Sequence, residues 1–255
     1  MKRKLPGWIF LLMTLLIPAA AHAAGKFSDE TLHYVITYKW GLIHKEAGTA
    51  TLRLAARGND YRLTLTGRTK PWADKLFQVR DTLYSTVDQS TLFPKRYVKI
   101  AHEGGKYSRD DISFTRQGNT VKGAVSKVRT DKKGETSTST GSLTATGPTF
   151  DMLSVFYYLR TLDYKALAAG GTVTASLFSG SKVETLTIRC EGSGTIKLRN
   201  GTSHQAYHIK FRFTSGGKKK SSDDIDAWIS TAPPHRPLQI FGSLPIGQVR
   251  VYLTD

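Results

Sequence analysis

The chain has 255 residues, of which 39% are hydrophobic and 22% are charged, with 23 glycines, 9 prolines and a single cysteine. This composition is that of an ordinary globular protein, and it excludes intrinsic disorder, a collagen-like repeat and a disulfide scaffold. The charge is less ordinary, because 37 basic residues against 20 acidic ones give a formal net charge of +17. The length suits one large domain or two small ones, and either can bury a core.

The N-terminal segment has the pattern of a secretory signal peptide. A basic start at residues 2–4 precedes an apolar stretch over 8–17, and Ala-His-Ala at 21–23 offers small residues to signal peptidase. The apolar stretch is too short to cross a bilayer core, which needs roughly 20 helical residues. We therefore expect cleavage after residue 23, a single domain over 24–255 without a transmembrane segment, and a location in a bacterial periplasm.

Alternation of apolar and polar residues recurs along most of the chain, which is typical of half-buried antiparallel strands. Tyr207–Phe213 is the clearest example, with apolar side chains on one face and basic ones on the other. Turns rich in Gly and Asn separate these runs, as tight hairpins require. The pattern predicts about thirteen strands, at residues 31–40, 46–57, 60–69, 76–87, 95–103, 106–115, 119–128, 172–179, 182–191, 194–200, 204–214, 224–231 with a continuation, and 246–254.

These strands predict a mainly β fold, a large curled antiparallel meander that forms a barrel or half-barrel around one buried hydrophobic helix. Consecutive hairpins favour a meander, and a sheet this wide rarely stays flat. The helix is expected over Phe150–Leu162, a run that is apolar on nearly all sides and therefore needs burial inside the curled sheet. The segment from about 128 to 148 is rich in Thr, Ser and Gly and predicts a mobile loop.

Three parts of the chain resemble the DUF3108 family of exported bacterial proteins. They are the opening pattern L-x-Y-x-x-x-Y-x-W-G at 32–41 followed by A-G-T-A-T-L at 47–52, the helix motif D-x-L-S-x-x-Y-x-L-R at 151–160, and the closing pieces at 228–230, 236–237 and 246–247. The resemblance covers nearly all of the chain after residue 23. It implies a β-domain in the cell envelope with no assigned reaction, similar in architecture to the half-barrels of periplasmic lipoprotein carriers. The acidic turn expected after W-x-S is T-A-P-P-H here, so no role tied to that turn carries over.

No motif of a catalytic or metal centre occurs in the sequence. The sequence contains no G-x-S-x-G elbow, no H-E-x-x-H, no glycine-rich phosphate loop and no C-x-x-C. His204 and His208 are four residues apart on a predicted strand, which separates them by about 13 Å, too far to share one ion. Cys190 shares the apolar strand face with Leu186 and Ile188, which favours an inert thiol. We therefore expect a protein that is not an enzyme and has no cofactor or metal.

The basic excess is concentrated, and it defines a candidate contact for polyanions. The segment 195–220 holds basic residues and no acid, and its candidate contacts for lipid, lipopolysaccharide or acidic glycan are Lys197, Arg199, Lys210, Arg212, Lys218, Lys219 and Lys220. The alternative is a set of solvated outer strand faces with a lysine-rich turn. Nucleic acid is not expected, because no basic helical stripe or zinc-finger spacing occurs.

Four residues are candidate ligand contacts: Trp72 in a polar loop, Phe156 and Tyr157 on the predicted helix, and Arg160 near its end. Arg160 has two interpretations, because it can complement the helix dipole or hold a ligand head group at the rim of an apolar cavity. Asp151 is expected to cap the N-terminus of the same helix.

Three classes of function remain compatible with the sequence. The first is a non-catalytic binding or carrier module for an amphiphilic or anionic cell-envelope molecule. The second is a structural or accessory protein whose basic face contacts anionic polymers or partner proteins. An enzyme that acts on a glycan or lipid has the least support, because the catalytic constellations are missing.

Overall fold

A computed structural model describes residues 26–215, 224–243 and 247–254 of the chain. The predicted signal peptide and the lysines at 218–220 lie outside the described residues. Within those ranges, no helix has the length and apolar character needed to cross a membrane.

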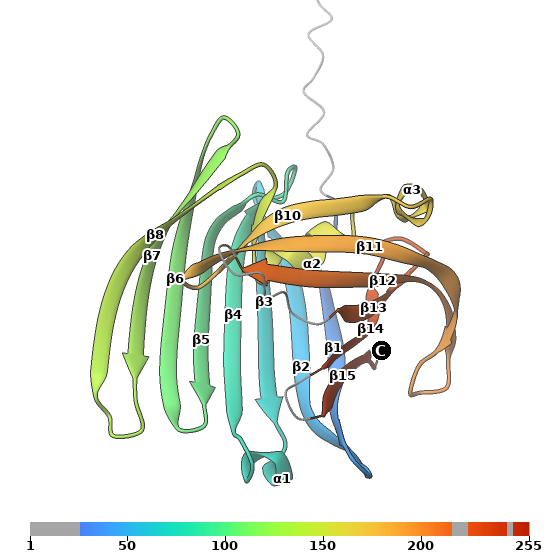
Figure 1. Cartoon of the computed structure of the whole chain (residues 1–255), viewed down its shortest axis with the longest axis horizontal. Helices are drawn as coiled ribbons and strands as arrows, with labels where there is room; N and C mark the ends of the chain where they lie inside the picture. Colours follow the sequence, from blue (N-terminus) through green and yellow to red (C-terminus); the bar gives the residue numbers. More distant parts are fainter. Residues whose placement is uncertain (1–25, 216–223, 244–246, 255) are drawn as a thin grey trace, which may run out of the picture.

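A single sheet of 15 strands forms the wall of the molecule, in the order β8-β7-β6-β5-β4-β3-β2-β1-β15-β14-β13-β12-β11-β10-β9 (Figure 1). Neighbouring strands are antiparallel, except that β9 and β10 pair in parallel. The strands are β1 (Glu30–Trp40), β2 (Ile43–Arg57), β3 (Asp60–Thr69), β4 (Val79–Asp88), β5 (Pro94–Glu103), β6 (Lys106–Gln117), β7 (Thr120–Thr130), β8 (Thr136–Thr146), β9 (Thr149–Asp151), β10 (Thr172–Ser179), β11 (Lys182–Lys197), β12 (Ser203–Ser215), β13 (Ile225–Ser230), β14 (Pro237–Ser243) and β15 (Gln248–Leu253).

The wall curls until its two edge strands, β8 and β9, approach each other. Because β9 follows β8 directly in the chain, the two edges start from the same turn. Phe178 on β10 then crosses the inner side of the wall and stacks on Phe114 of β6, with ring centroids 5.3 Å apart. Gly123 on β7 makes room for it, since a Cβ there would lie 2.8 Å from the Phe178 ring. The predicted mainly β, curled meander is confirmed as a nearly closed barrel.

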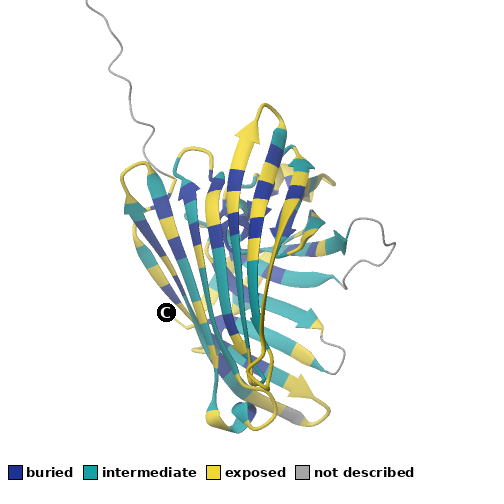
Figure 2. Ribbon diagram, turned by 90° about the vertical axis from the view of Figure 1, so that its left-hand side faces the viewer, coloured by how far each residue is buried: buried dark blue, intermediate teal, exposed yellow. Residues whose placement is uncertain are grey.

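Alternating side chains along the strands produce the core. Tyr61 and Leu63 on β3, Tyr97 on β5 and Ile112 on β6 are at most 1% exposed, and their neighbours in sequence face outward. Figure 2 shows buried and exposed residues alternating along the strands in this way. Where the pairing has no register shift, as from Tyr97 to Glu103 on β5, the same parity also assigns the inner face beyond the apolar core.

The hydrophobic segment after β8 lies inside the wall, but the prediction of one helix over 150–162 is wrong. The segment forms the short strand β9, helix α2 (Ser154–Leu159) and, beyond a turn, helix α3 (Tyr164–Ala168). Phe150 pairs with Leu177 of β10, so the sheet satisfies the backbone where the helix was expected to start. The side chain of Asp163 caps α3 by accepting a hydrogen bond from the Ala166 amide at 3.1 Å.

Asp151 anchors α2 to the wall. Its Oδ1 accepts hydrogen bonds from the amides of Leu153 at 2.7 Å and Ser154 at 2.8 Å, and the Asp151 amide donates to the Ser154 hydroxyl at 3.0 Å. The Ser85 hydroxyl of β4 donates to Oδ2 at 2.6 Å. The expected capping role is therefore present, and a link to β4 is added to it. Burial raises the pKa of this carboxyl, although the hydrogen bonds oppose that shift.

The mobile loop predicted at about 128–148 is contradicted by a regular strand. β8 pairs with β7 from Thr120↔Thr146 to Thr130↔Thr136, and the turn between the strands covers residues 131–135. Most of β8 is exposed on both faces, so no apolar residues mark one face of it. Backbone hydrogen bonds to β7 make this segment a strand. Because such bonds need no apolar side chains, the sequence shows no alternation that would predict it.

Smaller differences concern strand limits. The predicted strands 182–191 and 194–200 are one strand, β11, with a register shift between Cys190 and Gly192. The predicted start of β4 at residue 76 is three residues too early, because helix α1 (Pro71–Asp74) and the loop after it occupy the connection up to Val79.

We predict that Leu153→Ala lowers the free energy of unfolding by about 2–5 kcal/mol, because Leu153 is fully buried and the barrel wall cannot collapse onto the void. Tyr157→Phe is the matched control. Its hydroxyl is buried without a hydrogen-bond partner among the described residues, so its removal should leave stability unchanged or raise it by up to about 1 kcal/mol. Urea unfolding measures both. A loss of similar size in the two variants would contradict this account of the core.

Candidate functional site

An apolar pocket of about 410 Å³ lies at the end of the barrel opposite α2. Strands β1 to β4, the β15 strand and helix α1 supply its lining residues: Ile36, Tyr38, Ala47, Gly48, Gly67, Arg68, Thr69, Trp72, Ala73, Leu76, Phe77, Val79 and Val249. Almost all of the exposed lining is hydrocarbon or aromatic ring. The volume is within the roughly 300–1,000 Å³ range of small-molecule sites.

Local interactions position Trp72 in this lining. Pro71 starts α1, a favoured place for proline because the first helical amide needs no partner. The Trp72 indole N–H donates to the Glu46 carbonyl at 2.8 Å, which fixes the ring against β2. Asp74, at the end of α1, pairs with Arg80 of β4 at 2.7 Å. Trp72 was predicted to be an exposed loop contact, and the structure places it, half-buried, in the wall of the pocket.

Two glycines shape the pocket. A Cβ at Gly48 would lie 2.6 Å from the Arg68 carbonyl oxygen, so β2 and β3 approach as closely as they do only because Gly48 has no side chain. Gly67 lies on the inner face of β3, in register with Ala50 and Asp81, and a Cβ there would meet nothing within 4 Å. The space above Gly67 is therefore part of the open volume.

A row of charged side chains continues the inner face of the barrel from this pocket across β4 to β7. Asp81, Lys99, Asp110 and Arg129 share the parity of buried neighbours on their strands, such as Tyr97, and so face inward. Lys99 Nζ lies 3.5 Å from Asp81 Oδ2, and Arg129 pairs with Asp110. Each carboxylate side chain is about 15% exposed or less, whereas Lys99 and Arg129 are 33% and 43% exposed, so the carboxylates are shielded and their cationic partners reach solvent.

The surroundings of Asp81 displace its pKa from the ordinary value. Burial, followed by the neighbouring Glu103 carboxylate, raises the pKa of Asp81 to about 6, although Lys99 opposes the shift. One of its oxygens, Oδ1, is buried without a hydrogen-bond partner. Lys99 also donates to Glu103 at 3.1 Å. Burial acts to raise the pKa of Glu103, but the hydrogen bonds from Asp81 and Lys99 outweigh it and lower that pKa.

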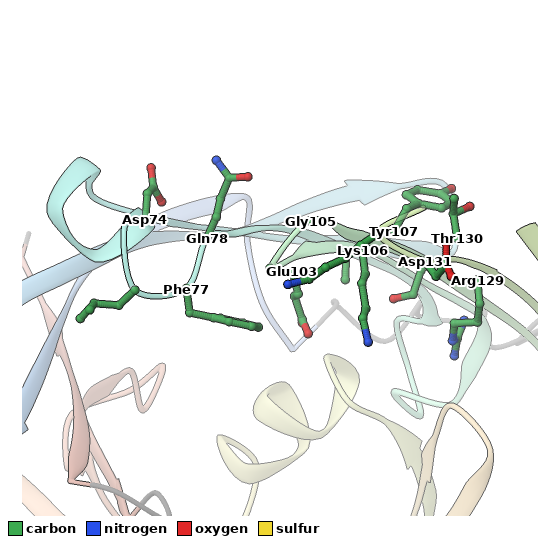
Figure 3. Close-up of a pocket in the computed structure, with 15 residues that line it drawn as sticks. Asp74, Phe77, Gln78, Glu103, Gly105, Lys106, Tyr107, Arg129, Thr130 and Asp131 are labelled. Carbon is green, nitrogen blue, oxygen red and sulfur yellow. The ribbon is translucent and has the colours of Figure 1, made fainter. Parts of the chain in front are cut away.

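A second, wider pocket of about 920 Å³ adjoins the apolar one and shares Leu76 and Phe77 with it. Figure 3 shows the side chains of Phe77, Glu103, Lys106 and Arg129 pointing to the same side of the strands, toward the interior. The Phe77 ring rests on the turn between β5 and β6, where a Cβ on Gly104 would lie 2.6 Å from it. The two pockets thus form one amphiphilic surface, apolar on one side of Phe77 and charged on the other.

The structure places the other predicted ligand contacts in the core near α2. Tyr157 is fully buried, and Phe156 is half-buried against the core. The Arg160 guanidinium is also buried. It pairs with both oxygens of Glu30, donates through Nε to the Pro234 carbonyl at 2.9 Å, and lies 4.6 Å from the Phe27 ring centroid. Arg160 therefore ties the interior helix to β1, and of the four candidates only Trp72 lines the apolar pocket.

Most described residues of the basic segment form ion pairs within the fold. Arg212 pairs with Asp224 at 2.8 Å, Lys210 lies 4.0 Å from Asp226, and Arg199 pairs with Glu46 at 3.2 Å. Lys197 is exposed near the end of β11. The carboxylates of Asp224, Asp226 and Glu46 thus offset much of the positive charge that the segment carries in sequence. The polyanion contact stays a prediction.

Four residues of the two pockets and the charged row were not predicted as site residues: Leu76, Phe77, Asp81 and Lys99. The signal for the charged row was present, since Lys99 lies two residues from Tyr97 on a strand and shares its face. Charged residues were instead assigned to outer faces by default. Within the described ranges, no cluster of three or more His, Cys, Asp or Glu side chains could hold a metal ion.

These features define a wide, nearly closed β-barrel that is packed at one end by its own helix and carries an amphiphilic pocket at the other. The model of the DUF3108 family, described as a protein of unknown function, matches residues 33–254, so the chain belongs to that family. The resemblance noted in the sequence is thereby confirmed.

A solved structure supports the same architecture. The chain is similar to a β-barrel-like protein of the domain of unknown function DUF1849 from Brucella abortus, with 12% sequence identity and a TM-score of 0.57. The alignment covers 89% of this chain and 96% of that one. At this identity the likeness shows the fold alone. No curated protein matches the chain with significance.

We predict that Asp81→Asn flattens the dependence of stability on pH between about 4 and 6. The folded pKa of Asp81 is about 6 against an ordinary 3.8, so its contribution to stability is present below pH 4 and is lost as the pH rises through 6. Relative to the wild type, the variant should gain about 1–3 kcal/mol between pH 4 and pH 7. Urea unfolding at a series of pH values measures this difference.

Asp111→Asn is the control of opposite sign. Its carboxylate faces outward on β6, where a hydrogen bond from Arg96 lowers its pKa, so its contribution is present at neutral pH and is lost only on acidification below the ordinary value. Parallel curves for Asp81→Asn and the wild type from pH 4 to 7 would show that Asp81 is not a protonated group of the folded state.

Proposed function

We propose that this chain is an exported, non-catalytic binding or carrier protein for an amphiphilic molecule of the bacterial cell envelope. The observation that carries the proposal is the pocket lined by Trp72, Phe77 and Tyr38, which adjoins the charged inner face of β4 to β7. Such a surface matches a ligand with a hydrocarbon part and a polar end. The signal-peptide pattern of residues 1–23 supports export to the periplasm.

The two halves of the site divide the ligand between them. The hydrocarbon part lies over Gly67 against Trp72, where removal of apolar surface from water supplies the affinity. The polar end lies beyond Phe77, where Lys106 and Arg129 line the wider pocket. Arg129 is already paired with Asp110, whereas Lys106 is exposed, so Lys106 is the side chain placed to meet an anionic head group. No proton or group transfer is required of these residues.

We predict that Gly67→Leu weakens the binding of an apolar naphthylamine fluorophore at least about tenfold, because the new side chain occupies the hydrocarbon site. The backbone tolerates the change, since Gly67 has no positive φ and open space surrounds its Cβ position. Fluorescence titration measures the dissociation constant. Gly194→Leu, at an exposed strand position that also has open space, is the matched control and should bind as the wild type does.

A second measurement addresses the natural ligand. Native mass spectrometry of the protein purified from a bacterial envelope extract should show a bound amphiphile in the wild type and a smaller occupied fraction in Gly67→Leu. Equal fluorophore binding in Gly67→Leu and Gly194→Leu, together with a ligand-free wild type, would refute the proposed function.

A further inference from the structure

Large apolar side chains are exposed at one end of the barrel. Trp40 and Leu42, in the hairpin between β1 and β2, are 55% and 105% exposed, and Leu76 and Phe77, after α1, are 73% and 55% exposed. Tyr84, on the outer face of β4, is the remaining large hydrophobic residue that is exposed in the described part of the chain. We call the group Trp40, Leu42, Leu76 and Phe77 the apolar tip.

The two loops of the apolar tip are held side by side. The Lys70 amide donates to the Ala47 carbonyl at 2.7 Å, and the Trp72 indole donates to Glu46, so α1 is fastened to β2 next to the β1–β2 hairpin. Figure 1 shows the hairpin and α1 projecting from the same end of the barrel. The tip is therefore formed by two neighbouring projections, of which the one after α1 also borders the pockets.

Exposed lysines flank the apolar tip. Lys39 and Lys45 lie on the two strands of the hairpin, and Lys75 directly precedes Leu76. The nearest carboxylates are already engaged, because Glu46 pairs with Lys70 and Asp74 pairs with Arg80. Positive charge around a projecting apolar group complements an anionic lipid surface, to which each nearby lysine contributes about 1 kcal/mol.

The apolar tip also borders the mouth of the pocket. Leu76 and Phe77 belong both to the tip and to the pocket lining, and Trp40 shares the inner face of β1 with Tyr38. Tryptophan, phenylalanine and leucine are the side chains that enter the boundary between head groups and acyl chains, and tryptophan prefers that depth. Exposed apolar side chains that gather at one place on a protein surface commonly mark an interaction site.

We propose that this end of the barrel docks on the surface of an anionic lipid bilayer. The side chains of the apolar tip enter the head-group boundary, Lys39, Lys45 and Lys75 face the lipid phosphates, and the mouth of the pocket opens onto the membrane. Docking goes beyond ligand binding and does not depend on it, because Trp40 and Leu42 project from the hairpin and do not line the pocket.

The test is vesicle flotation with the protein processed by a bacterial host, after intact mass has shown that the apolar segment at residues 8–17 is absent. Vesicles contain phosphatidylethanolamine with roughly a quarter phosphatidylglycerol, or phosphatidylcholine alone, at about 0.1 M salt. The wild type should float with the anionic vesicles and much less with the neutral ones. The double variant Trp40→Ser/Leu42→Ser should lose at least about tenfold in partitioning.

Tyr84→Ser is the matched control, because it removes an exposed aromatic ring far from the tip, and it should float as the wild type does. Thermal melts confirm that each variant is folded. Wild type that fails to float with anionic vesicles, or equal losses in Tyr84→Ser and the double variant, would overturn docking and leave this end as a surface for a protein partner or a second copy.

Ligand binding and membrane docking can be tested independently of each other. Trp40→Ser/Leu42→Ser should still bind the naphthylamine fluorophore, whereas Gly67→Leu should still float with anionic vesicles. Lys39→Gln/Lys45→Gln should weaken flotation at low salt and differ less from the wild type as salt rises, because exposed charges are screened beyond about 10 Å at 0.1 M salt. A salt-independent loss in this variant would contradict the charge contribution.

Discussion

The buried carboxylate of Asp151 keeps the two ends of this barrel different. It receives two amide hydrogen bonds from the start of α2 and one hydroxyl hydrogen bond from β4, and so holds the interior helix against one part of the wall. Arg160, at the other end of α2, pairs with Glu30 at the start of β1. With the helix fixed there, the inner face near Gly67 and Trp72 has no element of the described chain to cover it. The pocket therefore exists because Asp151 and Arg160 hold α2 at the other end of the barrel.

The pairing partners of buried charges explain why these groups are stable in the core. A buried arginine costs several kcal/mol unless its hydrogen bonds are satisfied. Arg160 meets that requirement with a bidentate carboxylate, a carbonyl and two aromatic rings. Asp81 does not meet it fully, since one oxygen is unpartnered, and burial together with the neighbouring Glu103 raises its pKa. Inside the barrel, the fully hydrogen-bonded Arg160 stabilises the fold, whereas Asp81, which has an unpartnered oxygen, lies in the candidate site.

The alternation of apolar and polar residues was enough to predict most strands of the wall. In runs such as Tyr207–Phe213, the apolar residues show which face of the strand is directed to the core. The β8 strand could not be predicted this way, because its Ser and Thr residues are exposed on both sides and its structure comes from pairing with β7. The helix was predicted too long, because Phe150 exchanges helical hydrogen bonds for pairing with β10.

Trp72 was found through its loop position, although burial of the ring against β2 needs a contact with Glu46 that no local pattern encodes. The neutralisation of Arg199 likewise depends on Glu46, a residue 153 positions away in the chain. Such long-range pairs are the part of the site that a single sequence does not contain. The inward direction of Lys99, by contrast, follows from the sequence alone, because Lys99 lies two residues after the buried Tyr97 on the same strand.

The unjoined edges of the wall set a mechanical property of the pocket. In a barrel sealed by hydrogen bonds, strand number and stagger determine the diameter. Here β8 and β9 are the two ends of one sheet, connected by the chain and by side-chain packing around Phe178, so no ladder of hydrogen bonds fixes the girth. The wall is one open sheet, so small changes in the twist between neighbouring strands can increase or decrease its curvature. A barrel with unjoined edges can change its girth without breaking a single strand pair.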